Sequence, residues 1–272
     1  MHLKCYDFSG IKIGVCCEKE LAETDGLRKF SCGDSAPDYM VTVEFCGRIQ
    51  ELSDGENAEW CCKRTKVEAN MPEQPFVCSA FSDGGCRMHV IEKYKDGFEA
   101  DSVFRHMPLS HVLLYHGAVI LHASYVLING EAILFSAPSG TGKSTQAELW
   151  KKHRGARIVN GDRAIVRFTE NGLTAGGIYY SGTSEYCENI TAPLKAIVLL
   201  GQAKESRISR CGGGEAMRRL FRECTYTAEF ENDPAKIAGI VADVVNSVPV
   251  YKLDCLPDES AVTALEEVLY GS

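Results

Sequence analysis

The sequence predicts an α+β or α/β protein in two parts, an antiparallel β domain over residues 1–105 and a mixed strand-and-helix domain over residues 106–272. Two observations carry this prediction. Apolar residues recur with period two up to about residue 104, which is typical of strands with one buried face. Beyond that point, dense aliphatic runs alternate with segments of good helix formers.

In the first part, the period-two pattern is clearest in two short segments that we expect to be strands: Ile11, Ile13 and Val15, and again Val41, Val43 and Phe45. Turn signals of the Ser-Asp-Gly type separate such segments. From Phe104 to Tyr115 the alternation is lost and apolar residues fall near helical spacing. We therefore predict a helical connector there and a domain boundary near residue 105.

The second part contains a succession of predicted strands and helices. Aliphatic and β-branched runs predict strands at 119–128, 132–135, 157–159, 164–168 and 194–200. Helices are expected after Lys143, over 215–224, from Pro234 onward and over 260–270. The run 132–135, the Ser/Gly-rich segment after it and the helix from Lys143 form a strand–loop–helix unit.

Composition excludes several classes of function. The net charge of −8 argues against a nucleic-acid-binding surface, which needs clustered Lys and Arg. The longest apolar stretch, 117–128, is broken by His122 and is shorter than the ~20 residues of a membrane helix. The first residues lack an apolar signal region and no CxxC pair occurs. We therefore expect a cytoplasmic protein, away from membranes, with its 13 cysteines as reduced thiols.

The loop after the strand 132–135 carries the strongest motif of the chain, Ala137-Pro138-Ser139-Gly140-Thr141-Gly142-Lys143-Ser144-Thr145. It matches the phosphate-binding pattern G-x-x-x-x-G-K-[ST], except that Ala137 replaces the first glycine. Gly140 and Gly142 can adopt positive φ, and the following helix adds the partial positive charge of its N-terminus. The motif predicts that residues 139–145 bind a nucleotide, with Lys143 on the β and γ phosphates and Ser144 on Mg²⁺.

A nucleotide site also needs a carboxylate, and Asp162 follows the strand 157–159 at a suitable place to bind Mg²⁺ or accept a proton. The alternative is that Asn160-Gly161-Asp162 is a hairpin turn, because Asn-Gly is a strong hairpin signal. Glu185 and Glu188 are weaker acidic candidates. His122, in the apolar strand before the loop, is by its chemistry alone more often a core residue than a catalytic one.

The order and spacing of three motifs resemble the HPr kinase/phosphorylase superfamily, in particular the HPr-kinase-like proteins of peptide-modifying gene clusters, such as lasso peptide kinases. The motifs are Leu121-His122-Ala123-Ser124, the loop 136–145, and Gly161-Asp162-Arg163, within a resemblance that covers residues 116–225. The resemblance implies a phosphoenolpyruvate-carboxykinase-like mixed sheet, ATP and Mg²⁺ as cofactors, and transfer of the γ-phosphoryl group to a serine hydroxyl. It also implies that His122 lies near the catalytic acids. Where the superfamily has two successive aspartates, this chain has Gly161 and Asp162.

These observations lead to the hypothesis of an ATP-dependent kinase acting on a hydroxyl group of a peptide or protein, with His122, Lys143 and Asp162 as catalytic residues and Ser144 and Asp162 as metal ligands. The β domain is then a candidate for binding the substrate or a partner, and assembly into a homo-oligomer is compatible with this picture. Two alternatives stay open. One is a non-catalytic ATP-binding adaptor for a peptide, and the other is a small-molecule kinase or carboxykinase-like enzyme.

Overall fold

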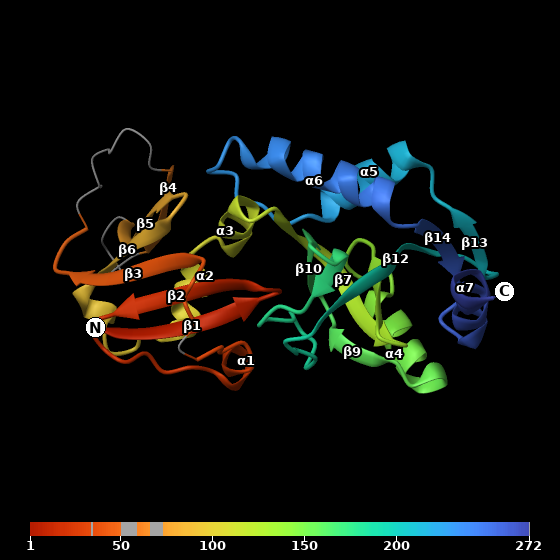
Figure 1. Ribbon diagram of the computed structural model, residues 1–272, viewed down its shortest axis with the longest axis horizontal. Helices are drawn as coiled ribbons and strands as arrows, with labels where there is room; N and C mark the ends of the chain where they lie inside the picture. The colour runs from red at the N-terminus through yellow and green to blue at the C-terminus, as the bar shows by residue number, and fades with distance from the viewer. Residues whose placement is uncertain (34, 50–58, 66–72, 272) are drawn as a thin grey trace. The chain divides into compact units, whose positions relative to one another are not determined.

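The computed structural model describes residues 1–33, 35–49, 59–65 and 73–271 (Figure 1). These residues form two compact units. The first unit contains residues 1–116 together with 226–231, and the second contains 117–225 together with 232–272. The boundary expected after residue 105 falls inside a helix, and the units divide after His116 instead.

The first unit is built on a six-stranded sheet in the order β1-β2-β3-β6-β5-β4. Its strands are β1 (His2–Phe8), β2 (Ile11–Cys17), β3 (Tyr39–Cys46), β4 (Glu59–Thr65), β5 (Gln74–Ser82) and β6 (Gly85–Ile91). Its helices are α1 (Asp25–Arg28), α2 (Ala100–His106) and α3 (Leu109–Tyr115), with a 3₁₀ turn, η1, at Glu92–Tyr94. The predicted helical connector is therefore two short helices, α2 and α3.

This sheet is mixed, and the expectation of a wholly antiparallel domain is wrong at two places. β3 runs parallel to both of its neighbours, β2 and β6. A parallel neighbour needs a long crossover, which the segment between β2 and β3, with α1 in it, provides. The period-two pattern of apolar residues shows that a strand has a buried face, but it does not show in which direction the neighbouring strand runs.

The first unit also contains a disulfide bond, between Cys62 of β4 and Cys78 of β5. The antiparallel register places these two residues directly opposite each other, with their Cα atoms 4.2 Å apart. The expectation that all cysteines are free thiols is therefore wrong for this pair. The other eleven cysteines, all among the described residues, form no disulfide bond, and most of them are buried.

The segment 226–231 lies between two helices of the second unit but belongs to the first. Its Phe230 is buried and stacks on the ring of His111 in α3, with the ring centroids 3.6 Å apart and the planes at 10°. Phe230 also meets Phe81 of β5 edge to face. The chain thus leaves the second unit after Thr225 and returns to it at Asn232.

The second unit is an eight-stranded mixed sheet in the order β11-β10-β7-β8-β12-β14-β13, with β9 paired to β7. β11 also pairs with β12, which closes the strands β7, β8, β12, β11 and β10 into a ring. The strands are β7 (Ala118–Ile128), β8 (Glu131–Ser136), β9 (Arg157–Asn160), β10 (Arg163–Thr169), β11 (Gly172–Gly176), β12 (Thr191–Gln202), β13 (Arg207–Arg210) and β14 (Val250–Cys255). Among them, β8, β12 and β14 are mutually parallel.

Helices cover both faces of this sheet. They are α4 (Lys143–Arg154), α5 (Gly213–Glu223), α6 (Asp233–Ser247) and α7 (Glu259–Tyr270). Trp150 of α4 and Leu265 of α7 pack with Val198 of β12 in one buried cluster. The preceding residue of β12, Ile197, points to the other face and lines a small apolar gap with Leu220 of α5 and Val241 of α6. This alternation is the side-chain period of a strand buried on both sides.

The structure confirms the predicted fold class, since two mixed sheets carry separate helices. It also confirms the strand–loop–helix unit, formed by β8, the loop after it and α4. The parallel strand β8 ends at this loop, and the carboxyl ends of parallel strands are where α/β sheets bind ligands. Among the helices of the described residues, none combines the length and apolar character needed to cross a bilayer.

Candidate functional site

The loop between β8 and α4 has positive φ at the two glycines where the motif predicts it. Gly140 and Gly142 have φ of 78° and 117°, and Gly142 is the N-cap residue of α4. A side chain built on either glycine would meet no atom of the described residues within 4 Å. Ser139, Ser144 and Thr145 are exposed, and Thr141 is half-buried. The turn is therefore open to solvent, with hydroxyl groups and the start of a helix around it.

Lys143 is the buried member of this loop, with 7% of its surface exposed. Its ammonium group donates a hydrogen bond to the carbonyl oxygen of Ala137 at 2.8 Å. Burial lowers the pKa of Lys143, and the negative charges of Glu223 and Asp162 oppose that shift. The ammonium group thus lies within electrostatic reach of two carboxylates from other parts of the second unit.

His122 and Asp162 come together through strand pairing. β9 and β10 both pair with β7, and the register places Arg163 opposite His122. The Nε2 atom of His122 lies 3.2 Å from a carboxylate oxygen of Asp162, and Nε of Arg163 lies 3.3 Å from the other oxygen. The hydrogen bond from His122 and the charges of Arg163, His122 and Lys143 lower the pKa of Asp162, although burial opposes this. Asp162 is therefore ionised at neutral pH.

The turn before Asp162 is held by the buried side chain of Asn160. Its Nδ2 donates to the carbonyl oxygens of Ile178 and Tyr180 at 3.0 and 2.9 Å. Its Oδ1 accepts from the backbone N–H groups of Asp162 and Arg163, both at 2.9 Å. The hairpin interpretation of Asn160-Gly161-Asp162 is thus wrong, because β9 and β10 are successive stretches along β7 rather than partners of each other.

Gly161 stands where the resemblance leads one to expect a second aspartate, and the surrounding structure explains the glycine. A Cβ atom at Gly161 would lie 2.1 Å from Oγ and 2.4 Å from Cβ of Ser184. A carboxylate side chain cannot fit at this position unless the segment 181–184 moves. Gly182 of the same segment comes close to Asp162, since a Cβ atom there would lie 3.1 Å from Cγ of the aspartate.

Glu223, at the end of α5, supplies a second carboxylate that no sequence pattern predicts. One of its oxygens lies 2.9 Å from Nδ1 of His122. Residues 122 and 223 are 101 positions apart, and no local spacing or motif connects them. Of the weaker acidic candidates, Glu188 forms an ion pair with Arg157 and Glu185 is exposed.

The residues of this site fit the Mg²⁺ that the motif implies only if a bound nucleotide supplies part of the metal's ligands. Within the described ranges, no group of three or more His, Cys, Asp or Glu side chains is arranged to hold a metal ion. Mg²⁺ bound with a nucleotide needs few protein ligands, because phosphate oxygens and water complete its shell. The exposed hydroxyl of Ser144 and the carboxylate of Asp162 are hard oxygen donors of the kind this ion prefers.

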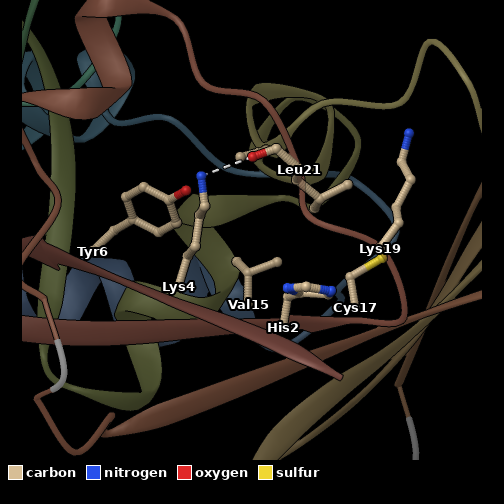
Figure 2. Close-up of a pocket in the computed structure, with 8 residues that line it drawn as sticks. His2, Lys4, Tyr6, Val15, Cys17, Lys19 and Leu21 are labelled. Carbon is tan, nitrogen blue, oxygen red and sulfur yellow. Dashed lines mark hydrogen bonds between the residues drawn. The ribbon is translucent and has the colours of Figure 1, made fainter.

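A small cavity in the first unit is not comparable to such a site. It has a volume of about 10 Å³, enough for one water molecule and far below the ~300 Å³ of the smaller ligand pockets. Figure 2 shows that Lys4 donates to the carbonyl oxygen of Leu21 beside it. Lys4 also lies 3.5 Å from Glu23, which accepts from Tyr6. The polar groups at this cavity therefore satisfy one another.

Comparisons with known proteins give limited information. No protein-family model matches the chain, and no curated protein matches it. Among solved structures, the chain is similar to the HPr(Ser) kinase/phosphatase from Coxiella burnetii. The similarity covers 55% of this chain and 95% of that one, at 11% identity and a TM-score of 0.32. These values are too low to assign a family, so the interpretation of the site depends on the residues described above.

Proposed function

We propose that this chain is an ATP-dependent kinase that transfers the γ-phosphoryl group of ATP to a hydroxyl group, that of a serine in a peptide or protein. The observation that carries the proposal is the convergence of the open loop after β8, the buried ammonium group of Lys143 and the ionised carboxylate of Asp162. Phosphoryl transfer depends mainly on positioning and charge stabilisation, which these groups supply.

In this proposal, the backbone N–H groups of residues 139–145 and the N-terminus of α4 bind the phosphates of ATP. Lys143 neutralises charge on the β and γ phosphates. Ser144 and Asp162 hold Mg²⁺, which neutralises further charge on the phosphates when bound. Burial of Lys143 weakens the hydration of its ammonium group, which strengthens its interaction with a phosphate that replaces the water.

Asp162 also faces the acceptor hydroxyl in this proposal. The hydroxyl oxygen attacks the γ-phosphorus in line with the bond to the leaving oxygen of ADP, and that bond breaks as the new one forms. Asp162 accepts the hydroxyl proton, while His122 and Arg163 orient its carboxylate. A low pKa makes Asp162 a weak base, which suits a loose transition state in which the proton leaves late.

The proposal is tested with Lys143→Ala, compared with Lys151→Ala as a control on the exposed side of the same helix. We expect Lys143→Ala to weaken binding of Mg-ATP about 100-fold, equivalent to about 2.8 kcal/mol. Lys151→Ala is expected to leave binding unchanged. Isothermal titration calorimetry measures both, and thermal unfolding checks that both variants fold. Wild-type affinity in the Lys143 variant contradicts the nucleotide site.

One observation favours the adaptor alternative, an ATP-binding protein that transfers nothing. Gly161 leaves the strand end with a single carboxylate, and Ser184 closes the position to a second one. ATP labelled at the γ-phosphate, incubated with fractionated lysate and the protein, distinguishes the possibilities. Label on a peptide or protein supports the proposed kinase, label on a small metabolite supports a small-molecule kinase, and binding without transfer supports the adaptor.

A further inference from the structure

His122 lies between two carboxylates that come from different elements. Its Nε2 faces Asp162 at 3.2 Å, and its Nδ1 faces Glu223 at 2.9 Å. The side chains of all three residues are largely buried, with 22%, 26% and 14% of their surface exposed in the order His122, Asp162 and Glu223. An imidazole ring whose two nitrogens face fixed acceptors has little freedom to rotate.

The backbone after α5 determines where Glu223 lies. α5 ends at Glu223, and the next residue, Cys224, is extended and forms a bridge with Leu121 of β7. The N–H group of Thr225 donates to the carbonyl oxygen of Ile120 at 2.8 Å. The segment that follows Glu223 is therefore paired with the part of β7 that precedes His122, which brings the two side chains together.

The same segment contacts the other side of the cluster. The hydroxyl group of Thr225 accepts a hydrogen bond from the guanidinium group of Arg163, which in turn pairs with Asp162. Glu223, His122, Asp162, Arg163 and Thr225 thus form one connected network, closed through the backbone between residues 223 and 225. A network with several fixed members holds each side chain more rigidly than a single contact does.

We propose that Glu223 is a positioning residue of this site, which holds the ring of His122 through Nδ1 so that Nε2 stays directed at Asp162. The consequence for the reaction rests on the kinase function proposed above. Glu223 then supplies, from α5, the second carboxylate that Ser184 excludes at Gly161. It acts through His122 rather than on the nucleotide, so its loss affects the turnover of bound ATP and not its binding.

The test compares Glu223→Ala with Glu215→Ala, a control two to three turns earlier on α5. Glu215 pairs with Lys252 at 3.1 Å and lies outside the His122 network. Release of phosphate from Mg-ATP, with water as the acceptor, measures turnover, and calorimetry measures affinity. We expect Glu223→Ala to lower kcat at least about tenfold and to keep the Kd of Mg-ATP within about threefold, while Glu215→Ala behaves as the wild type.

Glu223→Gln keeps an oxygen acceptor for Nδ1 and serves where the alanine variant fails to fold. We expect it to retain more of the kcat than Glu223→Ala does. Wild-type kcat in Glu223→Ala contradicts the proposal. A Kd that rises in parallel with the fall in kcat also contradicts it, because Glu223 would then act on the nucleotide.

A second measurement separates this proposal from the kinase function itself. The ring ¹⁵N signals of His122, assigned with a His122→Gln variant, report hydrogen bonding at each ring nitrogen without any turnover. We expect the Nδ1 signal to move in Glu223→Ala and to stay in place in Glu215→Ala. A wild-type protein that neither releases phosphate from Mg-ATP nor transfers the labelled γ-phosphate to any acceptor refutes the kinase function alone. If the Nδ1 signal of His122 has the same chemical shift in Glu223→Ala as in the wild type, the positioning role alone is refuted.

Discussion

At the residue scale, Lys143 shows how burial and charge act against each other in one side chain. Burial lowers its pKa, while Asp162 and Glu223 favour the charged ammonium form. The two carboxylates come from the turn between β9 and β10 and from the end of α5, which both follow Lys143 in the chain. The electrostatic environment of Lys143 therefore includes residues outside the loop motif.

Single residues also show what the sequence can and cannot predict. The positive φ of Gly140 and Gly142 follows from a local motif, and the structure has it. The contact of Glu223 with His122 has no local signal, because it depends on how α5 ends and on which strand the next residues pair with. Local patterns describe a turn well, but they contain no information on which distant side chains meet.

The close packing at Gly161 gives a prediction at this scale. Gly161→Ala places a methyl group against Ser184, so either the segment 181–184 or the strand end must move. We expect the free energy of unfolding to fall by about 2 kcal/mol, a typical cost of overpacking. Urea unfolding followed by circular dichroism measures it.

Ser184→Gly provides the matched control for this clash. The single variant loses the hydrogen bond that Ser184 accepts from the N–H group of Tyr186, and we expect it to be slightly less stable. In the double variant the side chain of Ser184 is absent and no longer clashes with the added methyl group. We therefore expect Gly161→Ala to lower the free energy of unfolding by less than it does in the wild type. Additive effects of the two changes would show that Ser184 is not the reason for the glycine.

At the element scale, β9 and β10 run in the same direction along β7 and are separated by the turn that contains Asp162. Both pair antiparallel with β7, in a register that continues from Asn160 opposite Tyr125 to Arg163 opposite His122. The Asn-Gly dipeptide predicts a hairpin because both residues readily adopt the positive φ angles of a two-residue hairpin turn. Here the buried amide of Asn160 makes four hydrogen bonds, and tertiary contacts decide the outcome.

The first sheet illustrates the same limit on prediction. The alternation of apolar residues located strands such as β2 and β3, because a half-buried strand repeats every two residues. The parallel direction of β3 relative to β2 and β6 depends on the crossover and on the order in which strands assemble. Neither property leaves a mark on the pattern of a single strand.

The role of Asn160 gives a prediction for the junction of β9 and β10. Asn160→Asp keeps the shape of the side chain but replaces a donor of two hydrogen bonds with an oxygen that faces two carbonyl groups. We expect the free energy of unfolding at neutral pH to fall by about 3 kcal/mol, since one oxygen of the buried carboxylate then faces two carbonyl oxygens and has no donor. Urea unfolding measures the change.

Asn189→Asp is the control for this substitution, because Asn189 is exposed and lies in the same unit. It introduces the same charge without burying it, and we expect a change below about 0.5 kcal/mol. Equal effects of the two substitutions would mean that the buried hydrogen bonds of Asn160 do not determine the stability of this turn.

At the scale of the whole molecule, the disulfide and the loop after β8 belong to different units. Cys62 and Cys78 lie in the first unit, and residues 139–145 lie in the second. Replacing both cysteines by serine removes a cross-link over 16 residues, which we expect to lower the free energy of unfolding by about 3 kcal/mol. Differential scanning calorimetry measures the loss, and Mg-ATP affinity should stay unchanged.

The free cysteine Cys16, half-buried in β2 of the same unit, provides the control. We expect Cys16→Ser to change the free energy of unfolding by less than about 1 kcal/mol. A loss of stability as large as that of the double cysteine variant would show that the cross-link itself contributes little.

Residues 226–231 belong to the first unit although they lie between two segments of the second, so the two units cannot be separated by a single cut in the chain. If the chain were cut after His116, Phe230 would stay in the C-terminal fragment, whereas the rings of His111 and Phe81 that it packs against would be in the N-terminal fragment. One fragment would expose an aromatic side chain that favours aggregation, and the other would have a hole where that side chain belongs. The two units therefore cannot be exchanged by cutting the chain once, and a recombinant protein that keeps the first unit must also keep residues 226–231.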